Sequence, residues 1–119
     1  VMIQTGDHDG PIAPIVAVNP AVVRPVYDKL TSDRAFIVAD AASHAQHTNY
    51  PLLPTSTWGR EIAAQYSLAW MNYHLLGNVE ALKVLQTAHP RLSYLWASEV
   101  VIGQDKRVFK SAGPALLPQ

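Results

Sequence analysis

The chain contains no cysteine and few charged residues. Because cysteine is absent from all 119 residues, disulfide bonds and thiolate metal sites are excluded. Charged residues make up only 15% of the chain, and nine basic residues balance nine acidic ones. No broad electrostatic attraction to nucleic acid or to an anionic membrane is therefore expected. The apolar runs are also too short to span a bilayer, so neither a nucleic-acid partner nor a membrane span is expected.

Hydrophobic residues form 49% of the chain, which is enough for a buried core. Two short apolar runs, at residues 1–5 and 34–39, predict buried strands. Between them, Asn19-Pro20 is typical of a helix start, and apolar residues at helical spacing predict a helix that continues to Leu30. Strand, helix and strand in this order predict a βαβ unit with parallel strands.

The second half of the chain is richer in helical patterns. A long helix is predicted from Thr57 to Leu76, ended by Gly77, and a shorter one from Val79 to about Ala88. The buried stripe expected on the long helix consists of Ile62, Tyr66, Ala69, Trp70 and Tyr73. Residues 92–96 and 100–102 fit either helix or strand, and residues 111–119 are expected to be an extended tail.

Two predicted strands are too few for a free-standing parallel sheet. The first would also present a bare apolar edge to water, which folded proteins avoid. We therefore expect another polypeptide, or a segment upstream of Val1, to complete the sheet.

Acidic residues and histidines follow both predicted strands. Asp7-His8-Asp9 follows the first strand, and the segment from Asp40 to His44 follows the second. Ligands bind at the carboxyl ends of parallel strands, so these side chains are candidates for a site. A histidine can act as a base for a serine hydroxyl, and a carboxylate can orient that histidine. The chain has no G-x-S-x-G nucleophile motif, so the serine would have to come from elsewhere.

The same residue types allow a metal-dependent hydrolase as a less favoured alternative. Imidazole and carboxylate ligands suit zinc or manganese, but the chain has no H-E-x-x-H arrangement. The residues available for such a site are Asp7, His8, Asp9, Asp40, His44 and His47. We expect no metal and no cofactor.

Four segments resemble the closing part of α/β-hydrolase-fold esterases. They are residues 6–14, Arg24-Pro25-Val26-Tyr27, Ala41-Ala42-Ser43-His44 and residues 66–71, with the sequence Y-S-L-A-W-M. The chain is most similar to cutinase-like polyester hydrolases and dienelactone-hydrolase-like lipases. In that family the triad acid lies in G-x-x-x-D-x-x-A-P, the base lies in G-A-S-H-F, and a helix with Y-S-I-A-W follows. The likeness covers about residues 1 to 78.

The resemblance implies that Asp9 is the triad acid and His44 the triad base. A second polypeptide would then carry the serine and the oxyanion hole, and a secreted or periplasmic location fits the family. One extra residue between Asp9 and Pro14 keeps Asp7 open as the acid. Ala45 replaces the phenylalanine of the family motif and the family's cysteine pair is missing, which disfavours a polymer substrate.

The expected fold is α/β, namely the C-terminal part of a doubly wound hydrolase sheet with two parallel strands and covering helices. Residues 1–78 would carry the triad acid and base, and residues 79–119 a helical extension and tail of the same domain. The expected function is hydrolysis of a carboxylic ester through an acyl-enzyme. Trp58 and Tyr50 are candidates to line its acyl or alcohol pocket. The alternative is a non-catalytic associating subunit, or a fragment, of the same fold.

Overall fold

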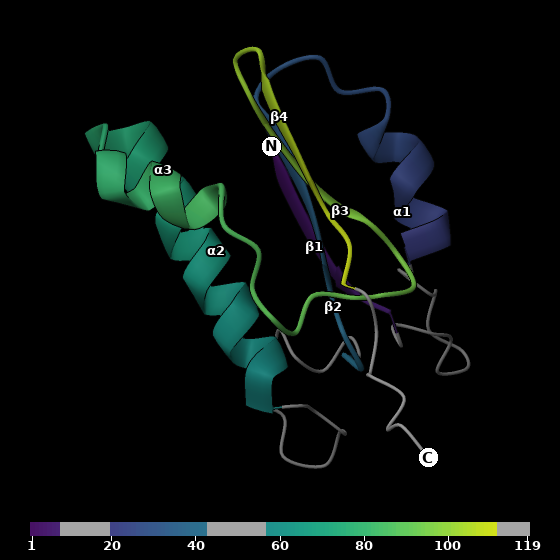
Figure 1. Cartoon of the computed structure of the whole chain (residues 1–119). Helices are drawn as coiled ribbons and strands as arrows, with labels where there is room; N and C mark the ends of the chain where they lie inside the picture. The colour runs from purple at the N-terminus through teal and green to yellow at the C-terminus, as the bar shows by residue number, and fades with distance from the viewer. Residues whose placement is uncertain (8–19, 43–56, 112–119) are drawn as a thin grey trace.

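The structure is a mixed four-stranded sheet with helices on both faces. It is a computed structural model that describes residues 1–7, 20–42 and 57–111. The strands form one sheet in the order β1-β2-β3-β4, with α1 on one face and α2 and α3 on the other (Figure 1). The elements are β1 (Met2–Gly6), α1 (Pro20–Tyr27), β2 (Arg34–Ala39), α2 (Thr57–Leu76), α3 (Val79–Leu85), β3 (Ser98–Ile102) and β4 (Asp105–Phe109). The predicted α/β class is confirmed.

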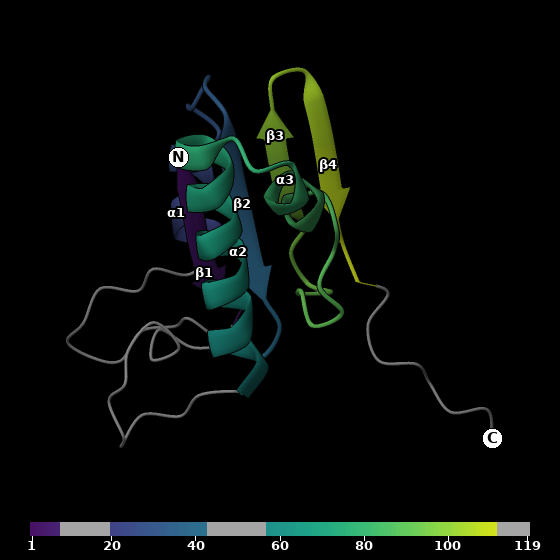
Figure 2. The same ribbon diagram turned by 90° about the vertical axis from the view of Figure 1, so that its left-hand side faces the viewer.

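The first half of the described fold is the predicted βαβ unit. Strands β1 and β2 pair in parallel, with Met2 opposite Ala35 and Gly6 opposite Ala39. Their carboxyl ends therefore lie next to each other, and Figure 2 shows both arrows pointing the same way. Strand β2 has its predicted bounds, whereas α1 ends at Tyr27 and is followed by a turn in which Leu30 N–H donates to the Tyr27 carbonyl at 2.9 Å.

The expectation of two strands followed by a helical extension is wrong beyond α3. Strand β3 pairs antiparallel with β2, and β4 pairs antiparallel with β3. The uncertain residues 100–102 are thus strand, and β2 lies inside the sheet rather than at its edge. Residues 98–109 belong to the same sheet as the βαβ unit, so β2 needs no further neighbour.

The β3–β4 pair is a hairpin whose strands are poorly marked in the sequence. Ile102 pairs with Asp105 across a two-residue turn, and Gly103 has a positive φ of 60°. Such tight hairpin turns require positive φ, which glycine adopts without strain. The strand that follows begins Asp105-Lys106-Arg107, and four of its five residues are exposed. Its sequence therefore lacks the apolar alternation that predicts a half-buried strand.

Helix α2 covers one face of the sheet with the predicted stripe. Ile62, Tyr66 and Ala69 are buried against β2 residues such as Ile37, and Trp70 and Tyr73 pack at the margin of this core. The helix has its predicted bounds, and Gly77, with φ 65°, follows its last residue. Within the described ranges, no helix is both long and apolar enough to cross a membrane.

Helix α1 covers the other face around a buried carboxylate. Tyr27 packs on Phe36 and Val38 of β2. Its hydroxyl donates to Oε1 of Glu99, a nearly buried residue of β3, at 3.1 Å. Arg24 lies 3.4 Å and Lys106 3.7 Å from the other carboxylate oxygen. The Glu99 charge is thus compensated by cations from α1 and β4, which ties the hairpin to the βαβ unit.

We predict that alkaline pH destabilises the fold through its buried tyrosines. Burial and the neighbouring Glu99 raise the pKa of Tyr27, and burial raises the pKa of Tyr66. Because each tyrosine has a higher pKa in the folded chain than in the unfolded chain, the neutral tyrosines contribute to the free energy of unfolding. This contribution is fully present below the unfolded pKa of about 10 and is lost as the pH rises through the folded pKa. Urea denaturation at increasing pH should show the free energy of unfolding falling above about pH 10.

The Tyr27→Phe variant separates this effect from general alkaline damage. It should lose about 1–3 kcal/mol at neutral pH, because the bond to a charged acceptor is removed, and should lose less on further alkalinisation. Tyr94→Phe is the control, since Tyr94 is exposed. An unchanged pH slope in Tyr27→Phe would contradict the assignment.

Candidate functional site

The carboxyl ends of β1 and β2 bring together the two segments that the sequence singles out. Gly6 and Ala39 are register partners, and Asp7 N–H extends the ladder by donating to the Ala39 carbonyl at 3.1 Å. Asp7 and Asp40 therefore leave the sheet at the same end. This is the end of a parallel pair at which α/β proteins bind ligands.

The carboxylate of Asp7 joins three segments of the chain. Its Oδ1 accepts a hydrogen bond from the backbone N–H of Ala41 at 2.8 Å. Its Oδ2 accepts one from the hydroxyl of Ser93, also at 2.8 Å. Asp7 thus holds the start of the loop after β2 and the segment that precedes β3, both next to the end of β1.

The side chain of Ser93 makes several hydrogen bonds at this end of the sheet. It is fully buried, and its backbone N–H donates to the Val38 carbonyl at 2.8 Å. Its Oγ accepts from the N–H groups of Leu95 and Trp96 while it donates to Asp7. With its donor and both acceptor positions in use, this hydroxyl is structural rather than a free nucleophile.

The close approach of the two strand ends depends on glycine at position 6 and on a left-handed backbone conformation at Ala41. A Cβ atom at Gly6 would overlap the carbonyl oxygen of Ala42, so only glycine allows this contact. Ala41 has a φ of 51°, which costs a residue with a side chain about 1–2 kcal/mol. Strain of this kind persists only where surrounding contacts hold it, and here the bond from Ala41 N–H to Asp7 does so.

A second cluster fixes Asp40. Its carboxylate lies 3.0 Å from Nη2 of Arg91, and its backbone N–H donates to the Arg91 carbonyl at 2.8 Å. The indole N–H of Trp58 donates to the Asp40 carbonyl at 2.7 Å, and the Arg91 guanidinium stacks 3.9 Å from the Trp58 ring centre. Trp58, a candidate for lining the acyl or alcohol pocket, therefore anchors α2 to the end of β2.

The predicted catalytic residues, Asp9 and His44, lie outside the described residues, as does Tyr50. Asp7, the alternative acid, is described, and its carboxylate contacts Ala41 and Ser93. Ser93 and Arg91 were not identified from the sequence. For Ser93 a signal existed, because serine at the start of a turn commonly accepts bonds from the next N–H groups.

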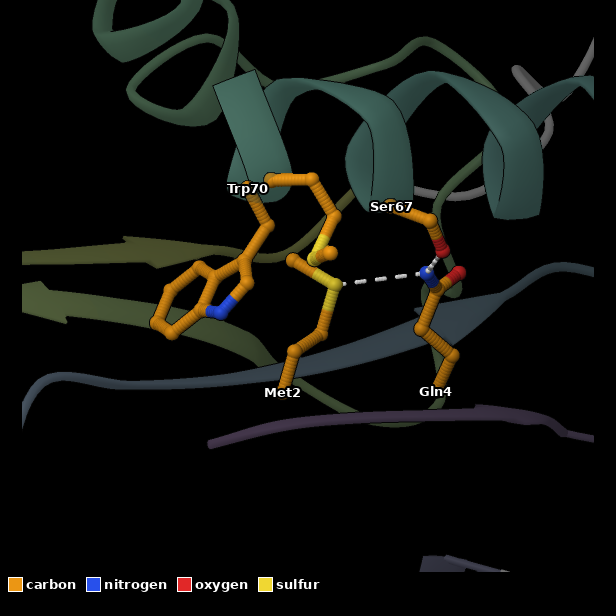
Figure 3. Close-up of a pocket in the computed structure, with 5 residues that line it drawn as sticks. Met2, Gln4, Ser67 and Trp70 are labelled. Carbon is orange, nitrogen blue, oxygen red and sulfur yellow. Dashed lines mark hydrogen bonds between the residues drawn. The ribbon is translucent and has the colours of Figure 1, made fainter. Parts of the chain in front are cut away.

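Two pockets in the described part of the chain lie away from this cluster. One, of about 390 Å³, lies between β1 and α2 and is lined by Met2, Gln4, Ser67, Trp70 and Met71 (Figure 3). The other, of about 280 Å³, lies between α2 and α3. Neither is lined by Asp7 or Asp40.

Most candidate ligands of the alternative metal site lie outside the described residues. Of its six candidate ligands, only Asp7 and Asp40 are described, and each is engaged in the contacts above. Across residues 1–7, 20–42 and 57–111, no group of three histidine or carboxylate side chains is placed to hold a metal ion.

Comparison with known proteins adds no relative. No protein-family model matches the chain, and neither the curated proteins nor the solved structures contain a significant match.

We predict that Gly6→Ala destabilises the protein by about 1–3 kcal/mol, the usual cost of forcing an extra carbon into a packed site. The measurement is the urea unfolding midpoint. Ala41→Gly, next to Ala42 in the chain, is the matched variant. It relieves the positive φ, so its free energy of unfolding should be unchanged or higher by up to about 1 kcal/mol. A Gly6→Ala variant as stable as the parent would refute the close approach.

We predict that Ser93→Ala lowers the free energy of unfolding by about 1–3 kcal/mol, because it leaves two partly buried N–H groups without their acceptor and Asp7 Oδ2 without this donor. Ser32→Ala serves as control, since Ser32 lies in an exposed turn and should change stability by less than about 0.5 kcal/mol. Equal effects in the two variants would contradict the role assigned to Ser93.

Proposed function

We propose that this chain is part of a serine-type carboxylic ester hydrolase. His44 acts as the general base and Asp9 orients it, while a second polypeptide supplies the serine and the oxyanion hole. The substrate is a carboxylic ester that reacts through an acyl-enzyme.

The observation that supports this proposal best is the hydrogen bond between Asp7 and Ala41. It joins the ends of two parallel strands at the edge where α/β enzymes hold their catalytic groups. In the sequence, Asp9 follows Asp7 by two residues, and His44 follows Ala41 by three. The two segments that carry the proposed acid and base therefore start from one clamped point.

In the proposed reaction, His44 takes one proton from the serine hydroxyl and returns it to the departing alcohol. The serine oxygen attacks the ester carbonyl while one imidazole nitrogen takes the hydroxyl proton, and the carboxylate on the other nitrogen stabilises the imidazolium. The proton then passes to the departing alcohol as the C–O bond breaks. Water, activated by the same histidine, hydrolyses the acyl-enzyme to the carboxylic acid and restores the serine. No other co-reactant is needed.

Asp9 is preferred over Asp7 as the acid because of what Asp7 already holds. Both Asp7 oxygens accept hydrogen bonds, and losing either would release the Ala41 turn or the buried Ser93 hydroxyl. We therefore assign Asp7 a positioning role and keep the proposed contact with the imidazole for Asp9.

A non-catalytic associating subunit is the second candidate. Exposed apolar side chains on α2 support it, since Leu68, Met71 and Leu75 are all more than half exposed. Such a surface suits association whether or not the chain takes part in catalysis.

The test is ester turnover in the protein assembled with its serine-bearing partner. We expect His44→Ala and Asp9→Asn each to lower kcat by about 10⁴-fold, the scale seen when a triad member is disabled. Fluorophosphonate labelling of the partner serine should fall with His44→Ala, because the hydroxyl loses its base.

Two controls give this test its specificity. Ser43→Ala should leave turnover unchanged, since the proposal places the nucleophilic serine in the second polypeptide. Asp7→Asn should chiefly reduce stability. Undiminished turnover in His44→Ala, or the absence of any fluorophosphonate-reactive serine in the assembly, would favour the non-catalytic subunit.

A further inference from the structure

The two outer strands of the sheet have opposite chemistry. Strand β4 carries Asp105, Lys106 and Arg107, all exposed, and charged side chains of this kind prevent a further strand from pairing. Strand β1 reads Met-Ile-Gln-Thr-Gly and has no charge. Of the described strands, only β2 pairs with β1. The sheet is therefore protected against extension at β4 and not at β1.

The backbone of β1 turns hydrogen-bonding groups away from β2. Val1 C=O accepts from Ala35 N–H, and Asp7 N–H donates to Ala39 C=O, so the odd-numbered residues bond to β2. Because backbone groups alternate along a strand, those of Met2 and Gln4 point to the opposite side. The N–H and C=O groups of these two residues form a short row of donors and acceptors, here called the ladder, whose spacing suits hydrogen bonds to another extended strand.

Helix α2 carries exposed apolar residues, of which Met71 lines a pocket with Met2 and Gln4 of β1, whereas Leu68 lines the pocket towards α3. Leu68, Met71 and Leu75 are 63%, 53% and 71% exposed and recur at helical spacing. They form a stripe separate from the one that α2 packs on β2. Exposed stripes of this kind are typical of surfaces that another chain covers.

The pocket of about 390 Å³ lies between β1 and α2 (Figure 3). Met2, Trp70 and Met71 supply its apolar lining. Its polar members are bonded to each other, because Gln4 Nε2 donates to Ser67 Oγ at 2.7 Å and also lies 3.2 Å from the Ala63 carbonyl. The lining by Met2, Trp70 and Met71 suits an apolar side chain.

We infer that β1 is extended by a strand from a second polypeptide, with alternate apolar side chains directed at α2 and one of them in this pocket. A second copy of this chain fits less well, since two-fold symmetry would force antiparallel pairing of β1 with itself. The β1–β2 pair is parallel and covered by helices on both faces, an architecture usually continued by parallel strands. Identifying the added strand with the serine-bearing polypeptide rests on the proposed function; the strand addition itself does not.

The experiment uses the full chain and a synthetic seven-residue peptide of alternating valine and threonine, acetylated and amidated. Hydrogen exchange of the Met2 and Gln4 amides is followed by NMR with and without about 1 mM peptide, a concentration suited to weak binding. Exchange at both amides should slow at least about tenfold when the peptide pairs with them.

Two charge substitutions of matched exposure make the result specific. Met71→Lys should abolish the protection, because it places an ammonium beside the pocket. Val108→Lys on β4 should leave it unchanged, since Met71 is 53% and Val108 56% exposed.

Three outcomes would overturn the inference: no protection at Met2 and Gln4, protection at the β4 amides instead, or protection that survives Met71→Lys. Sedimentation of the chain without peptide supplies a fourth. A dimer that dissociates on Met71→Lys would make a second copy the occupant. Because the peptide contains no serine and no ester is turned over, failure here leaves the proposed function standing, and failure of the ester assay leaves the strand addition standing.

Discussion

The close approach of Gly6 and Ala42 is the constraint on which the candidate site depends. It allows the end of β1 to pass against the loop after β2 with no side chain between them. The left-handed turn at Ala41 and the Asp7 carboxylate that accepts its N–H are both consequences of that proximity. Ser93 then attaches a third segment, from late in the chain, to the same carboxylate. A small number of buried polar contacts thus decides where two loops leave the sheet.

Strand β1 contributes to two different surfaces of the molecule. Its carboxyl end leads into the segment that carries the proposed acid, while its outer side has the uncharged ladder and the pocket against α2. A polypeptide paired along β1 would reach the end of the strand at which Asp7 lies, as well as extending the sheet. Association and chemistry would then depend on the same few residues.

The parts of the fold with strong periodic signals could be predicted from the sequence. Strand β2 and helix α2 have their predicted bounds, because a continuous apolar run and a long buried stripe ending at Gly77 leave little ambiguity. Strand β4 could not be predicted, since its charged, exposed residues owe their conformation to pairing with β3. At the site, Asp7 was considered for its position after the first predicted strand and for the extra residue between Asp9 and Pro14. Its bond to Ser93 joins residues far apart in the sequence, and no local pattern reports such a contact.

The central position of β2 has a consequence for how the protein is made. Its partner on one side, β1, precedes it in the chain, whereas β3 on the other side ends only at Ile102. The residues of β2 from Ala35 to Ala39 are all buried in the folded protein. During synthesis, however, one edge of β2 stays unpaired until β3 has left the ribosome. During this interval the unpaired edge of β2 is open to association with other chains.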